Sequence, residues 1–135
     1  MSGYTIVNLE DSPDVTGEHP GELRMLTRQL GSEQVSVTHR TIPPGKGHVM
    51  GNRDIGHRHA TQEEVYFLVS GRLKAKLDDE VTEIGPGTAV RVAPEVVRSF
   101  WNDGGEEAAL LIVSNHAVDA RQDAEMVQGF WPEHP

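Results

Sequence analysis

Three residues near the middle of the chain have the types and spacing of a metal site. His57 and His59 are two apart, so on extended backbone both imidazoles point to the same face. Glu64 follows, and its carboxylate can return to that face if residues 60–63 make a short turn. Two nitrogens and one oxygen suit a divalent cation, and three protein ligands leave coordination positions open to water or substrate. The residues therefore predict an open, catalytic type of metal site.

The segments around these residues are predicted to be strands. Clusters of Gly, Pro and Asp separate short stretches rich in Val, Ile, Leu and Thr, a pattern typical of an all-β sandwich or barrel. The expected strands cover residues 4–9, 22–30, 34–42, 63–70, 72–77, 81–84, 88–92, 97–101 and 108–114. A tail over residues 115–135 is expected to hold one short helical turn near residues 123–128.

Alternation of side chains predicts which strand faces are buried. Residues 72–77 alternate apolar and basic side chains, which indicates one buried and one solvated face. Residues 63–70 carry apolar or aromatic side chains on both faces, which predicts a central strand buried on both sides. In the strand over residues 34–42, Val35, Val37 and His39 are expected to point inward, and Arg40 outward.

Composition narrows the classes of function. The 135 residues suit one domain, residues 1–135, and the formal net charge of −9 disfavours nucleic acid and anionic membrane surfaces as partners. With no cysteine, a metal must be bound by nitrogen and oxygen ligands. The sequence holds neither a signal-peptide pattern nor an apolar stretch of the ~20 residues needed to cross a bilayer, so a cytoplasmic protein is expected.

The spacing of glycines around the histidine pair resembles a known family motif. Gly51, five residues, His57, one residue, His59, four residues, Glu64, six residues and Gly71 match the first cupin motif without a gap. The resemblance covers roughly residues 33–114. It implies the cupin-type double-stranded β-helix, a jelly-roll barrel, with a divalent ion such as Fe, Mn, Ni or Zn at His57, His59 and Glu64.

The second cupin motif is only partly present. Counted from Gly87, Asn102 falls in place, but Ala93 stands where the motif has proline and Glu95 where it has glycine. Arg98 occupies the position of the third metal-binding histidine, and a guanidinium has no lone pair to offer a metal. The resemblance therefore leaves the metal site without its usual third imidazole.

Two hypotheses account for Arg98, and a third imidazole has two other possible sources. The guanidinium could bind a substrate carboxylate or phosphate, or it could form an ion pair with Glu64 or Glu95. His39 is better explained as a core histidine, and His48 is an outside candidate for the metal. Three further histidines are expected to be solvated: His19, His116 and His134.

These inferences combine into two hypotheses of function. The first is a metal-dependent enzyme, dioxygenase-like or isomerase-like, acting on a small polar or anionic metabolite, with Arg98 orienting the substrate and Tyr66 hydrogen-bonding it. The second is a cupin that binds or senses a small molecule without metal or catalysis. Because members of this family commonly dimerise, a homodimer is expected, with the Phe130–Trp131 tail anchored on its own barrel or on a neighbouring subunit.

Overall fold

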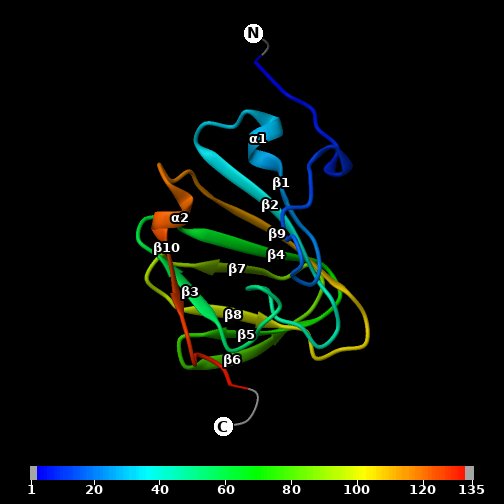
Figure 1. Ribbon diagram of the computed structural model, residues 1–135, viewed down its shortest axis with the longest axis vertical. Helices are drawn as coiled ribbons and strands as arrows, with labels where there is room; N and C mark the ends of the chain where they lie inside the picture. The colour runs from blue at the N-terminus through cyan, green and yellow to red at the C-terminus, as the bar shows by residue number, and fades with distance from the viewer. Residues whose placement is uncertain (1–2, 133–135) are drawn as a thin grey trace.

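The computed structural model describes residues 3–132, whose strands form two facing antiparallel sheets (Figure 1). The first sheet has the order β1-β2-β9-β4-β7 and the second β10-β3-β8-β5-β6. The strands of the first sheet are Leu23–Met25, Val35–Ile42, Ala108–Asn115, Glu64–Ser70 and Ala89–Val92, in that order. Those of the second are Ala124–Val127, Gly56–His59, Arg98–Trp101, Leu73–Leu77 and Glu80–Ile84. The predicted all-β fold is confirmed, although the two sheets are not closed into a barrel by strand pairing within the described residues.

The hydrophobic core lies between the sheets and is built by alternation along the strands. On β5, Leu73 and Ala75 are fully buried while Lys74 and Lys76 are directed away from the core, as the sequence predicts. The core cluster consists of Ile42, Tyr66, Leu68, Leu73, Ala75, Ile84, Val92, Phe100, Ala108 and Leu110. Burial of these side chains is what holds the two sheets face to face.

Three sequence-based expectations about secondary structure are wrong. Residues 4–9 form no strand, and the predicted strand over 22–30 ends at Met25, where the helix α1 (Leu26–Leu30) begins. The expected helical turn near 123–128 is instead the end of α2 (Ala120–Asp123) followed by strand β10. Neither β3 nor β10 was among the expected strands. These short segments are extended because they pair with one another across the chain, from Ala124 opposite His59 to Val127 opposite Gly56, and no local pattern encodes such a pairing.

The facing of β2 is the reverse of the prediction. Arg40 and Ile42 point into the molecule and are 3% and 0% exposed, whereas Val35 is 44% exposed. The guanidinium of Arg40 is buried because its N–H groups donate to backbone carbonyls, among them the carbonyl of His48 at 2.8 and 3.0 Å. His39 therefore lies on the outer face, paired with Leu111 of β9.

The outer face of β4 is also more exposed than the sequence predicts. Val65, Phe67 and Val69 are 37%, 39% and 50% exposed in the single chain. Their inward neighbours, Tyr66 and Leu68, are buried as expected. The prediction that β4 is buried on both sides is therefore wrong for the single chain, in which the outer face of β4 is exposed.

The C-terminal segment is anchored on its own chain by aromatic and backbone contacts. Phe130 donates its N–H to the Asp54 carbonyl and accepts a hydrogen bond from Lys76 Nζ at 2.7 Å. The guanidinium of Arg53 lies 5.1 and 5.3 Å from the rings of Trp101 and Trp131. This segment follows β10 along the second sheet (Figure 1). No helix in the described part of the chain has the length and hydropathy to cross a membrane.

Candidate metal centre

The predicted metal ligands come from two strands in opposite sheets. His57 and His59 project from β3, and Glu64 is the first residue of β4. One ligand atom from each of the three lies within 4.8 Å of the others, and within residues 3–132 no other group of His, Cys, Asp or Glu side chains meets this condition. The Oε1 atom of Glu64 is 3.6 Å from Nε2 of His57 and 3.3 Å from Nε2 of His59. The expected turn between β3 and β4 thus brings all three together.

A fourth residue, which the spacing of the motif does not indicate, orients His59. Asp123, at the end of α2, has its Oδ2 atom 3.1 Å from Nδ1 of His59. The same carboxylate accepts hydrogen bonds from the backbone N–H groups of Thr61 and Gln62 at 3.0 and 3.1 Å and from the Thr61 hydroxyl. These bonds lower the pKa of the Asp123 carboxyl against the opposing effect of burial. A carboxylate that accepts from the far nitrogen of a ligating histidine is a recurrent partner of metal sites.

The Asp123 contact determines which nitrogen of His59 can bind a cation. Because an ionised carboxylate only accepts, Nδ1 of His59 carries the proton that it donates to Asp123. In the neutral ring Nε2 then has a free lone pair, and it faces the Glu64 oxygen at 3.3 Å. Two acceptors this close repel each other unless a positive charge lies between them. The donor set therefore fits a divalent cation, which would bind both atoms.

The carboxylate of Glu64 is held in its ionised form. Burial acts to raise its pKa, but the two imidazoles and the Tyr66 hydroxyl outweigh this effect, and the pKa lies well below the ordinary value. The Tyr66 hydroxyl donates to Oε1 and is 3.5 Å from His57 Nε2. Burial raises the pKa of Tyr66 well above its ordinary value, so the hydroxyl keeps its proton. The Tyr66 hydroxyl therefore donates its hydrogen bond to Glu64.

Arg98 lies beneath the site with its side chain 0% exposed. Its Nε atom is 3.8 Å from Oε1 of Glu64, which makes Glu64 the ion-pair partner; no such contact joins Arg98 to Glu95 in the described residues. Its terminal nitrogens donate to the backbone carbonyls of His57, Val92, Ala93 and Pro94 at 3.2 to 3.5 Å. The guanidinium is therefore placed to position Glu64 and the strand ends beside it.

A pocket of about 240 Å³ opens over the three ligands. It is lined by Leu23, Arg40, His48, Val49, His57, His59, Glu64, Tyr66, Ile112, Ala124 and Met126. Leu68 and Phe100, on the inner faces of β4 and β8, belong to the core and do not line the pocket. The glycine-rich connection after β2 contributes His48, and β10 contributes Ala124 and Met126. The C-terminal strand is thus part of the pocket wall, which sequence spacing alone does not indicate.

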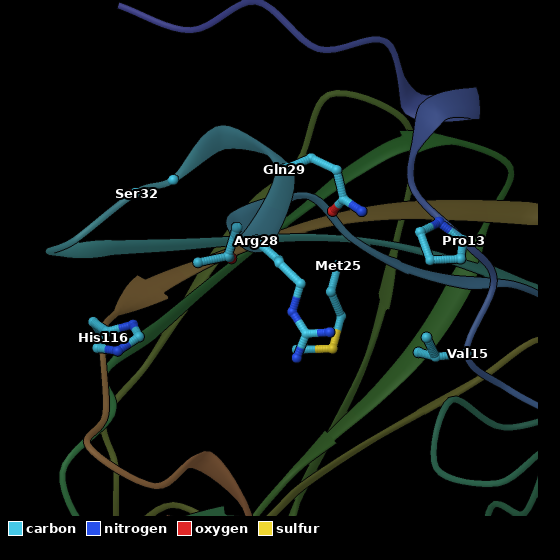
Figure 2. A pocket seen from close by; sticks show the side chains of 9 residues that line it. Pro13, Val15, Met25, Arg28, Gln29, Ser32 and His116 are labelled. Carbon is cyan, nitrogen blue, oxygen red and sulfur yellow. The ribbon is translucent and has the colours of Figure 1, made fainter. Parts of the chain in front are cut away.

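A larger hollow, of about 500 Å³, lies away from this site beside α1 (Figure 2). Met25, Arg28 and Gln29 border it together with Pro13, Val15 and His116 (Figure 2). Its lining contains one histidine and no carboxylate, so it does not compete with the triad as a metal centre. His19 and His116 are exposed, as the sequence analysis expects, and His134 lies outside the described residues.

The comparisons with known proteins agree with this fold. A family model described as "Cupin domain" matches residues 39–114, which is more than half of the chain. The chain belongs to the cupin family.

Individual relatives support the fold without defining a reaction. An uncharacterized protein from Methanocaldococcus jannaschii is 27% identical over 79 residues, and the match covers 58% of this chain and 62% of that protein. A sugar phosphate isomerase of the cupin superfamily from Silicibacter pomeroyi superposes with a TM-score of 0.72 at 16% identity, covering 92% of both chains. The polyketide cyclase RemF from Streptomyces resistomycificus gives 0.71 at 19% identity, covering 97% of this chain and 89% of the other.

Proposed function

We propose that this cupin is a metal-dependent enzyme, dioxygenase-like or isomerase-like, that acts on a small polar or anionic metabolite. The observation that carries the proposal is the pair of acceptors, His59 Nε2 and Glu64 Oε1, at 3.3 Å. A divalent cation held by these atoms and by His57 would polarise an oxygen of the substrate or bind dioxygen. The pocket of about 240 Å³ above it suits a small molecule.

The protein side chains have distinct roles in this proposal. Asp123 holds His59 with the Nε2 lone pair facing Glu64, and Arg98, which does not line the pocket, lies 3.8 Å from the Glu64 carboxylate as its counter-charge. Tyr66 donates its proton to Glu64 in a hydrogen bond and can transfer this hydrogen bond to an oxygen of the substrate. Two of the similar structures are named as enzymes, an isomerase and a cyclase, which is compatible with catalysis here.

A second candidate is a cupin that binds a small molecule without metal or catalysis. Arg98, buried 3.8 Å from Glu64, favours it, because a guanidinium can supply the positive charge that the carboxylate needs. In this alternative a second proton on His59, rather than a cation, separates its Nε2 from the carboxylate. The two candidates therefore differ in what lies between His59 and Glu64.

Metal content distinguishes the two candidates. The protein is purified without a metal-affinity tag or chelator and analysed for iron, manganese, nickel and zinc, beside a His57→Ala/His59→Ala variant. A His19→Ala/His116→Ala variant, which removes two exposed histidines, is the matched control. About one equivalent in wild type and control, with none in the site variant, supports the enzyme. If the wild-type protein neither contains metal nor takes up added metal, the metal-dependent enzyme is excluded and the metal-free, ligand-binding cupin is supported.

We further propose a homodimer in which a second copy covers the outer face of β4. This face presents the exposed Val65, Phe67 and Val69 next to the apolar outer residues of β9, with Val65 opposite Val113 and Phe67 opposite Leu111. Contiguous apolar patches of this kind are typical of interaction surfaces. Sedimentation analysis of wild type and Phe67→Glu tests it: a dimer that dissociates in the variant is expected, and a monomeric wild type contradicts it.

A further inference from the structure

A fourth histidine, His48, lies against the triad without belonging to it. Its ring centroid is 5.1 Å from that of His57 and 6.1 Å from that of Tyr66, and it meets the Phe100 ring edge-on at 5.1 Å. His48 is 8% exposed and lines the same pocket as the metal ligands. Because Arg98 cannot bind a metal, His48 is the histidine beside the triad that could be considered as a third imidazole ligand.

Hydrogen bonds fix the orientation of His48 and the position of its proton. The Phe100 backbone N–H donates to Nδ1 of His48 at 3.2 Å, and the His48 N–H donates to the Phe100 carbonyl at 3.1 Å. The His48 carbonyl accepts from Arg40. Because a backbone N–H can only donate, Nδ1 must offer its lone pair, and the ring proton resides on Nε2.

The same bond excludes His48 as a metal ligand. With the Nδ1 lone pair occupied by the Phe100 amide, Nε2 could bind a cation only if the ring lost its last proton and became an imidazolate. Nε2–H is instead a donor, and it is buried with no hydrogen-bond partner among the described residues. Buried donors in native proteins are almost always paired with protein, water or ligand.

The charge beside His48 indicates the kind of acceptor that this donor meets. Arg40 lines the same pocket at 3% exposure and forms no ion pair within residues 3–132. Glu64 is the single carboxylate among the pocket-lining residues, and it is paired with Arg98, which lies outside that lining. The buried guanidinium of Arg40 therefore has no carboxylate partner among the described residues on this wall of the pocket, which favours an anionic oxygen there.

We propose that His48 is a fixed hydrogen-bond donor that binds an anionic oxygen of the ligand, such as that of a small carboxylate, and is not a third imidazole for the metal. The inference deepens the proposed function, since it rests on a small molecule occupying this pocket. It does not require the cation. His48 would then select ligands that place a carboxylate between the triad and β2.

The tautomer of His48 tests the first half of the proposal directly. Long-range proton–nitrogen NMR spectra of ¹⁵N-labelled protein distinguish Nε2–H from Nδ1–H, with His48→Asn used to assign the signals. The expected result is Nε2–H in metal-free protein, unchanged when Zn²⁺ shifts the nitrogens of His57 and His59. An Nδ1–H tautomer, or a His48 nitrogen that binds Zn²⁺, overturns the proposal. If Zn²⁺ shifts no histidine while His48 keeps Nε2–H, the metal function fails and the donor role stands.

Ligand affinity tests the second half. Oxalate and acetate are the probes, titrated by calorimetry into metal-free and Zn²⁺-loaded protein. His48→Asn keeps an oxygen acceptor for the Phe100 N–H but removes the Nε2 donor, while His48→Gln places an amide donor near the Nε2 position. His39→Asn, on the outer face of β2, is the control.

The expected loss follows from the strength of a hydrogen bond to a charged group. Oxalate affinity should fall at least about 10-fold in His48→Asn, recover in part in His48→Gln and stay unchanged in His39→Asn. Oxalate binding in His48→Asn equal to that of wild type, with a native circular dichroism spectrum, overturns the proposal. The proposal is also overturned if wild-type protein binds neither oxalate nor acetate, both when metal-free and when loaded with Zn²⁺.

Discussion

Replacing Asp123 with Asn should reverse the tautomer of His59 and weaken metal binding. The aspartate carboxylate uses one oxygen for two donors of Thr61 and the other for the Gln62 N–H and His59 Nδ1. An asparagine keeps most of these bonds with its oxygen on Thr61 and its amide toward His59. The amide would then donate to Nδ1, and the ring proton would move to Nε2, where it bonds to Glu64 and blocks ligation.

The size of this effect follows from the contacts that change. Loss of an orienting carboxylate typically costs about 10- to 100-fold in metal affinity, which is about 1.4 to 2.8 kcal/mol. The Gln62 N–H also loses its acceptor, for a further cost of about 1–3 kcal/mol in the free energy of unfolding. The variant should therefore bind Zn²⁺ more weakly and melt at a lower temperature than wild type.

Competition with a chromophoric chelator measures the Zn²⁺ affinity, and Asp119→Asn is the matched control. Asp119 caps α2 by accepting from the N–H groups of Arg121 and Gln122, and it is exposed. Asparagine caps helices about as well as aspartate, so this control removes the same charge without touching the site. Equal Zn²⁺ affinities of Asp123→Asn and wild type would refute the claim that Asp123 sets the tautomer of His59.

Three other predictions concern stability. Glu64→Gln should leave the buried Arg98 without its counter-charge and lower the free energy of unfolding by about 3 kcal/mol in metal-free protein; a denaturant midpoint equal to that of wild type would argue against the ion pair. Gly56→Ala places a Cβ 2.6 Å from the Phe130 ring and should detach the C-terminal segment, with a loss of about 1–3 kcal/mol, whereas Gly105→Ala meets no atom within 4 Å and should be neutral by the same measurement. Burial lowers the pKa of His48 and His57, so at low pH the unfolded chain takes up protons that these two side chains exclude in the folded chain. The stability of metal-free protein should consequently fall as the pH drops below about 6.5, and a melting temperature that is flat between about pH 7.5 and pH 5.5 would contradict this.

The sequence predicts the ligand triad well because its information is local. The H-x-H spacing on extended backbone, a short turn and a glutamate at the start of the next strand require no knowledge of distant contacts. The alternation of apolar and basic side chains along β5 likewise identifies the inner face of that strand. The all-β fold class is predicted by the Gly and Pro residues that separate short apolar stretches along the chain.

The parts of the site that the sequence does not predict depend on long-range contacts. Asp123 is 64 residues from His59 and reaches it only because β10 pairs with β3. Arg40 has the side chain of a surface residue, and it is buried because backbone carbonyls accept all of its hydrogen bonds, most of them from residues 8 to 20 positions away. The position of the His48 proton is set by an amide 52 residues away. Residue type alone cannot reveal a partner that the fold supplies.

X-ray absorption spectroscopy of the zinc-loaded protein identifies the ligands of the proposed metal site, because imidazole ligands give a distinctive scattering pattern. The predicted result is a site with two imidazoles, from His57 and His59, and a shell completed by oxygen from Glu64 and water. His57→Ala should remove one imidazole, and His48→Asn should remove none. A third imidazole in wild type, no imidazole at all, or a protein that loses its zinc on desalting would contradict a metal site formed by His57, His59 and Glu64.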